Sequence, residues 1–206
     1  MSKKQKSVFE YLGLPGLISM FGLAAGWLAV VLLLQNLPFL AITFAIIAFF
    51  LDCFDGYVAR KTHTASEFGR QLDGSLDFFN YLVFSALLFW RYISPNPLGI
   101  IVGFFILATG VFRLIRFNVE GFVVRDNQLY YAGIVVCHVS LTAIVLFFIQ
   151  QFYPQFIGTI AVPTMVIVSL LQISRIPVKK TDTYGLWLTL AFMLLIISLG
   201  FQLWQK

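Results

Sequence analysis

Charged residues are scarce in this 206-residue chain: Lys, Arg, Asp and Glu together make up 11% of it, and no polar run is long enough to form a separate soluble domain. Only two cysteines and two histidines are present. Cys53 and Cys137 both lie in apolar stretches, where we interpret them as small buried hydrophobic residues. The chain also contains no soluble internal repeat and no low-complexity tract. These absences exclude an extramembrane catalytic domain and give no reason to expect a nucleic-acid partner.

Apolar residues dominate instead: 60% of the chain is hydrophobic, 23 residues are phenylalanine, and apolar runs close to bilayer-spanning length recur. This pattern predicts an all-α integral membrane protein with a single domain over residues 1–206 and about seven transmembrane helices, six to eight being compatible. Lys3, Lys4 and Lys6 precede the first apolar run, which continues beyond the length of a signal-peptide core. We therefore expect that run to be retained.

Turn and cap signals divide the chain into elements. Residues 2–11 suit a short segment lying at the headgroup level. Thr64 and Glu67 fit a capping box at the start of the third helix, and Pro163 predicts a kink in the sixth span. The predicted spans cover approximately residues 12–34, 38–60, 64–93, 98–118, 129–150, 155–174 and 184–204.

Basic residues mark one side of the membrane. With seven spans and the amino terminus inside, only Arg91 and Lys206 fall outside. The segments on the inner side contain the other twelve, namely Lys3, Lys4, Lys6, Arg60, Lys61, Arg70, Arg113, Arg116, Arg125, Arg175, Lys179 and Lys180. This asymmetry follows the positive-inside rule and predicts a cytoplasmic location for the inner side.

Four aspartates stand in and beside the apolar runs of the second and third helices. Asp52 and Asp55 are three residues apart, while Gly69, Asp73 and Asp77 follow a spacing of four, so each set can line one helical face. Carboxylates that converge at membrane depth repel each other and require cations or water. Oxygen ligands alone favour Mg²⁺, Mn²⁺ or Ca²⁺ over metals held by His or Cys.

Small and basic residues accompany these acids. Gly56, Ala59 and Gly69 would let a bulky ligand approach the backbone, and Arg60 and Arg70 offer guanidinium groups for phosphate. Metals that neutralise phosphates beside small residues and arginines suit a diphosphate substrate undergoing in-line displacement.

The complete pattern is D-x2-D-G-x2-A-R-x8-G-x3-D-x3-D, formed by Asp52, Asp55, Gly56, Ala59, Arg60, Gly69, Asp73 and Asp77. In these eight positions the chain resembles the CDP-alcohol phosphatidyltransferase family, and its size and helical content agree over nearly its whole length.

The resemblance implies roles for the matching residues. Asp52, Asp55, Asp73 and Asp77 would hold two divalent ions, Mg²⁺ or Mn²⁺, with Ca²⁺ able to occupy the same place, and Asp77 would accept the alcohol proton. Gly56, Ala59 and Gly69 would surround the cytidine of a CDP-diacylglycerol donor, with Arg60 steadying phosphate or carboxylates. The acceptor hydroxyl would attack the lipid-side phosphorus and CMP would leave. The family also leads us to expect a homodimer among membrane lipids.

The eight-residue motif does not identify the acceptor alcohol. The segments FRLIRFN and LLQISRIPVKK resemble those of phosphatidylserine synthases, which implies L-serine. The chain departs from that subfamily at residues 15–19 (PGLIS) and 131–135 (YAGIV), so glycerol 3-phosphate, inositol phosphate, choline and ethanolamine stay as alternative acceptors.

Arg113 and Arg116 are three residues apart at the end of the fourth span, where their guanidinium groups could bind a serine carboxylate or a substrate phosphate. The simpler interpretation is that they bind lipid headgroups at the inner surface. An ion-coupled transporter is the rival to the enzyme, but it predicts acids near the bilayer midplane and inverted repeats, whereas these acids cluster at one end of two adjacent helices.

Overall fold

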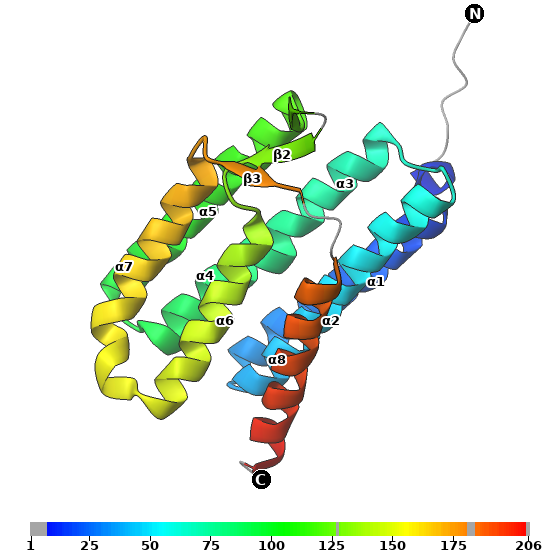
Figure 1. Cartoon of the computed structure of the whole chain (residues 1–206). Coiled ribbons are helices and arrows are strands. Elements are labelled where there is room, and N and C mark those ends of the chain that lie inside the picture. The colour runs from blue at the N-terminus through cyan, green and yellow to red at the C-terminus, as the bar shows by residue number, and fades with distance from the viewer. Residues whose placement is uncertain (1–7, 127, 181–183, 205–206) are drawn as a thin grey trace, which may run out of the picture.

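The computed structural model describes residues 8–126, 128–180 and 184–204, and this part of the chain forms seven helical rods (Figure 1). One rod is composite and runs over Glu67–Ile93. The other six are α1 (Val8–Leu34), α2 (Pro38–Lys61), α5 (Pro97–Glu120), α6 (Val136–Phe152), α7 (Pro154–Ile173) and α8 (Tyr184–Trp204). The expectation of a helical membrane protein is confirmed.

Four rods are long and apolar enough to cross a bilayer: Leu12–Leu34, Pro38–Lys61, Glu67–Ile93 and Pro97–Glu120. The apolar helices Val136–Phe152, Ile157–Ile173 and Leu188–Trp204 are shorter. The helices agree with most of the predicted bounds, but the count of about seven full spans is not confirmed. Large apolar side chains such as Phe21, Phe104 and Phe112 point outward, as expected for a surface in contact with lipid.

The composite rod consists of α3 (Glu67–Asp77), a π-helical segment η1 (Phe78–Val83), α4 (Phe84–Leu88) and a second π-helical segment η2 (Phe89–Ile93). Ser66 caps its start, because the extended Ser66 backbone lets its Oγ accept a 3.0 Å hydrogen bond from the backbone N–H of Gly69. The predicted capping box on Thr64 is therefore wrong: Glu67 is the first helical residue.

A small antiparallel sheet joins the ends of three helices and was not predicted. It is formed by β1 (Val123–Arg125), β2 (Gln128–Ala132) and β3 (Pro177–Lys179) in the order β1-β2-β3, with Tyr130 opposite both Val123 and Lys179. The predicted fifth span therefore begins too early, because residues 128–132 form a strand and the helix starts at Val136. The sheet lies at the same end of the bundle as the start of α3 (Figure 1).

The chain is already helical at Val8, but α1 is broken at Gly13, whose φ of 53° and ψ of −170° are not helical. A short helical piece is thus set off before the first span. Residues 1–7 of the predicted headgroup segment lie outside the described residues.

Aromatic side chains pack against one another near the start of α2, at the other end of this helix from its acidic residues. The buried ring of Phe39 on α2 contacts Phe147 and Phe148 of α6, and stacks on Phe201 of α8 at a centroid distance of 5.2 Å with nearly parallel planes. The helix α2 therefore forms a common support for α6 and α8, while its other end carries the acidic residues.

Candidate metal and phosphate site

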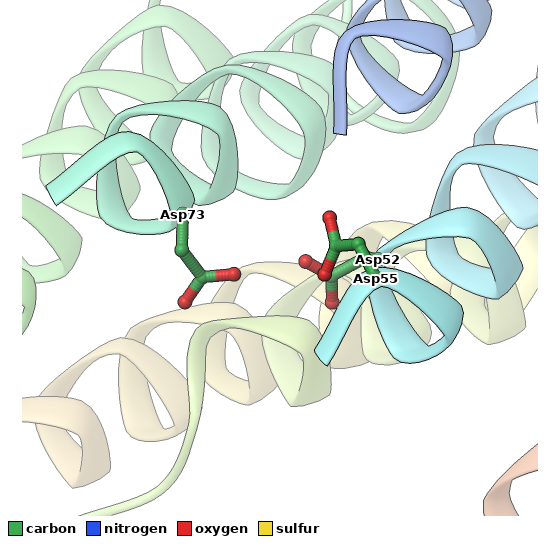
Figure 2. A group of neighbouring side chains, drawn as sticks. All are labelled: Asp52, Asp55 and Asp73. Carbon is green, nitrogen blue, oxygen red and sulfur yellow. The ribbon is translucent and has the colours of Figure 1, made fainter. Parts of the chain in front are cut away.

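Three of the four predicted aspartates converge. Asp52 and Asp55 project from α2 and Asp73 projects toward them from α3 (Figure 2), and one oxygen from each carboxylate lies within 4.8 Å of the others. Asp55 is buried, Asp52 is partly buried and Asp73 is exposed. The spacing of three on α2 places both of its acids on the face toward α3, as the sequence predicted.

Two hydroxyl groups from other elements orient the α2 carboxylates. Tyr81 of η1 donates a 2.8 Å hydrogen bond to Oδ2 of Asp52, and Ser19 of α1 donates one of 2.5 Å to Oδ2 of Asp55. Neither residue was predicted. Their sequence signal is weak, since single serines and tyrosines are common in membrane helices without any role in a site. Hydrogen bonds of this kind fix the direction in which a carboxylate presents its free oxygen.

The triad fits a divalent cation by its donor chemistry. All three donors are carboxylates, which suit Mg²⁺, Mn²⁺ and Ca²⁺, and the two α2 acids already have the hydrogen-bonded second layer typical of metal ligands. Asp77 is not part of the triad, but it borders the same cavity as Asp52 and Asp73.

An open cavity of about 220 Å³ adjoins the triad. It lies between α2, α3, α5 and β2, and it combines acidic, basic and aromatic walls. Its lining consists of Asp52, Cys53, Gly56, Arg60, Arg70, Asp73, Gly74, Asp77, Arg113, Leu114, Phe117, Asn118, Tyr131 and Val135. Carboxylates at one wall and three guanidinium groups at the others can accept a diphosphate together with its cations.

Small residues shape this cavity, although not all of the predicted ones contribute. A Cβ added to Gly56 would lie 3.3 Å from Nη1 of Arg60, so the missing side chain makes room for that guanidinium group. Gly74 plays a similar part beside the amide of Asn118 and was not predicted. Ala59 and Gly69 are not among the residues that line the cavity.

Arg113 is the most deeply buried arginine of the site, with 3% of its surface exposed. Its guanidinium carbon lies 5.2 Å from the ring centroid of Phe117 and 5.7 Å from that of Tyr131. These cation–π contacts hold the group at the cavity wall.

Arg116 points elsewhere and binds the backbone. Its guanidinium group is within hydrogen-bonding distance, 2.5 to 3.0 Å, of four carbonyl oxygens, those of Ala132, Gln172, Ile173 and Ser174. It therefore ties α5 to β2 and to the end of α7. The two arginines, for which the sequence predicts the same role, have different surroundings.

The fold and site define a helical membrane protein with a carboxylate triad beside a basic cavity. The sequence model of the family described as CDP-alcohol phosphatidyltransferase matches residues 12–204, and the chain belongs to that family. The chain is thus a transferase, and family membership decides between the enzyme and the transporter.

Three individual proteins are similar to this chain over half of its length or more. The chain is 29% identical over 188 residues, 87% of its own length and 75% of the other, to the archaetidylserine synthase of Methanothermobacter thermautotrophicus. It is 34% identical over 120 residues to the CDP-diacylglycerol–serine O-phosphatidyltransferase of Methanocaldococcus jannaschii, covering 57% of this chain and 56% of that one. The protein of the same name from Bacillus subtilis is 33% identical over 110 residues, 52% of this chain and 62% of the other.

Proposed function

We propose that this protein transfers a phosphatidyl group from CDP-diacylglycerol to L-serine, giving phosphatidylserine and CMP, in a reaction that depends on Mg²⁺ or Mn²⁺. The observation that carries the proposal is the juxtaposition of the Asp52–Asp55–Asp73 triad with a cavity lined by three arginines. The choice of serine rests on the names of the relatives, all of which are serine-transferring enzymes.

In this proposal the carboxylate triad, together with Asp77, would hold the divalent ions. Ions bound there would neutralise the diphosphate and stabilise the negative charge that develops on it. The donor's phosphates would lie between the acids and the guanidinium groups of Arg60 and Arg70, and its cytidine would lie beside Gly56, which lines the same cavity.

Asp77 serves as the base. Its carboxylate would take the proton of the serine hydroxyl while the serine oxygen bonds to the phosphorus carrying the lipid. The bond from that phosphorus to the CMP oxygen breaks, and CMP leaves with the electron pair.

The site is proposed to face the cytoplasm, because the segments around the cavity contain most of the basic residues of the chain. Water-soluble serine reaches it from that side and the lipid donor from the bilayer. A homodimer is part of the same proposal and follows from the family.

An acceptor panel tests the function. Purified protein in detergent receives CDP-diacylglycerol, Mn²⁺ or Mg²⁺, and one of L-serine, glycerol 3-phosphate, inositol phosphate, choline or ethanolamine, and CMP release is measured. A parallel series uses a CDP-linked archaetidyl donor, since one relative is named for that group. Among the five acceptors, we expect CMP release only with L-serine, and no release after EDTA has removed the divalent ion. CMP release with a different acceptor and not with L-serine would show that this other alcohol is the acceptor. No CMP release in any series would refute the transferase activity.

A further inference from the structure

Asn118 contributes an uncharged amide to the wall of the cavity beside the triad. Among the described residues that line this cavity, it alone carries a side-chain amide. It lies near the end of α5 and is partly buried. Within the part of the chain that the structure describes, its side chain makes no hydrogen bond to another residue. The amide is therefore available to a ligand in the cavity.

Gly74 of α3 determines which way this amide points. A Cβ added to Gly74 would lie 3.3 Å from Nδ2 of Asn118, and no other atom of Asn118 would be within 4 Å of it. The amide nitrogen therefore packs against α3, and the oxygen on the other arm of the amide is turned away from that helix. An amide oxygen accepts hydrogen bonds and cannot donate them. The wall thus presents an uncharged acceptor at this position.

The helix α3 places this acceptor about one turn from Asp77. Gly74 precedes Asp77 by three residues, which is a rise of about 4.5 Å along the helix axis. Gly74 is also nearer than Asp77 to the start of α3, at the end of the bundle that the proposed function assigns to the cytoplasm. An acceptor that enters from the cytoplasm and brings its hydroxyl to Asp77 therefore has the rest of the molecule beside Asn118.

The ammonium group of L-serine fits this acceptor in both chemistry and reach. An ammonium group donates three hydrogen bonds and accepts none, and a bond from a charged donor is stronger than one from a neutral donor. In L-serine two carbon atoms separate the hydroxyl oxygen from the ammonium nitrogen. With a hydrogen bond of about 2.8 Å at each end, the molecule can span one helical turn. The quaternary nitrogen of choline has no N–H group to donate.

We propose that Asn118 binds the ammonium group of the acceptor: its Oδ1 accepts a hydrogen bond from that group while the hydroxyl of the same molecule lies at Asp77. Asn118 thereby favours amino alcohols over acceptors without an N–H group. This inference rests on the proposed transfer to serine, and it adds a residue that selects the acceptor.

Asn118→Ala tests the inference by removing the acceptor oxygen. We expect the KM for L-serine to rise about 10- to 100-fold, as for loss of a hydrogen bond to a charged group, with kcat little changed. Turnover of 3-hydroxypropanoate, which is serine without its ammonium group, should be poor in the wild type and no poorer in the variant. Asn118→Asp keeps an acceptor oxygen and should retain much of the affinity for serine.

Glu120→Gln is the matched control for this series. It changes an exposed side chain two residues further along the same helix, outside the lining of the cavity, and should leave the KM for L-serine unchanged. An unchanged serine KM in Asn118→Ala would overturn the inference. So would an equal loss of turnover with L-serine and with 3-hydroxypropanoate.

A second substitution tests the contact that orients the amide. Gly74→Ala adds a methyl group 3.3 Å from Nδ2 of Asn118, so the amide must shift by a few tenths of an ångström. We expect the KM for L-serine to rise, by less than in Asn118→Ala. In a chain that already carries Asn118→Ala, the added methyl group should change nothing further. An effect of Gly74→Ala that is equally large in both backgrounds would overturn the assigned orientation of Asn118.

A binding measurement separates this inference from the proposed function. Equilibrium binding of radiolabelled L-serine in the presence of CMP and Mn²⁺ needs no turnover. Serine binding that weakens in Asn118→Ala without any CMP release by the wild type would refute the transfer reaction and retain the site. CMP release with the same serine KM in wild type and Asn118→Ala would retain the reaction and overturn the role of Asn118.

Discussion

The hydroxyl of Tyr81 donates a 2.8 Å hydrogen bond to Oδ2 of Asp52, from a π-helical turn that begins one residue after Asp77. The wider turn of a π-helix is common at functional sites, and here it presents a buried phenol to a carboxylate of the neighbouring helix. The third rod of the bundle thus contributes Asp73, Asp77 and the group that orients Asp52.

Tyr81→Phe should weaken the site without unfolding the protein. Loss of this hydrogen bond leaves Asp52 free to rotate, so we expect a roughly 10- to 100-fold weaker affinity for Mn²⁺. Electron paramagnetic resonance of free Mn²⁺ measures it. Tyr92→Phe is the control, since the Tyr92 hydroxyl donates an equal 2.8 Å bond to the Leu33 carbonyl, away from the triad. Equal Mn²⁺ affinity in the two variants would contradict the prediction.

Asp77→Asn and Asp52→Asn should fail in different ways. The amide at position 77 cannot take the acceptor proton, so kcat should fall roughly 10²- to 10⁴-fold while Mn²⁺-dependent binding of CDP-diacylglycerol is largely retained. The amide at position 52 removes a member of the triad, so donor binding should weaken as well. Single-turnover CMP release and donor binding are measured side by side. Wild-type turnover in either variant would remove the assigned role.

Arg116→Met should reduce stability. Four carbonyl oxygens lose their common donor, and we expect the free energy of unfolding to drop by about 2–4 kcal/mol. Thermal unfolding in detergent micelles measures this as a lower midpoint. Arg125→Gln, on the exposed strand β1, is the matched loss of charge and should leave the midpoint unchanged. A wild-type midpoint for Arg116→Met would show that these bonds contribute little.

Gly26→Ala should disturb the contact between α1 and η1. A Cβ at this position would overlap Oδ1 of Asn80, and because Asn80 is buried its side chain has little room to turn away. Such overpacking reduces stability by about 1–3 kcal/mol. In Gly158→Ala the new methyl group meets no atom within 4 Å, so the midpoint should stay the same or rise slightly. If both variants unfold alike, the packing argument is wrong.

Local patterns were sufficient to predict that the carboxylates of Asp52, Asp55 and Asp73 converge. Asp52 and Asp55 share a face because they are three apart on one helix, and the motif spacing placed Asp73 on the next helix. Helix bounds followed from apolar length and from proline positions such as Pro97 and Pro154. These inferences need only neighbouring residues.

Contacts between residues far apart in the chain could not be predicted from the sequence. The strand β3 is three residues long, and the basic sequence around it resembles any inner loop, so its pairing with β2 had no local signal. Arg113 and Arg116 look equivalent in sequence, yet one stacks on Tyr131 and the other binds carbonyls of α7. Arg116 lies about one helical turn closer to the end of α5, where β2 and the end of α7 are within reach. A π-helical turn such as η1 likewise has no reliable sequence pattern.

The order of synthesis gives the sheet a further consequence. Every residue that lines the open cavity has been synthesised once Val135 has been added, but the strand that carries Tyr131 pairs with Pro177–Lys179, and the carbonyls that hold Arg116 belong largely to residues 172–174. A nascent chain that stops before α7 therefore contains all of the lining residues while one wall of the cavity lacks its support. The protein should therefore become able to bind its substrate only late in biogenesis, when the last quarter of the chain packs against the first three quarters.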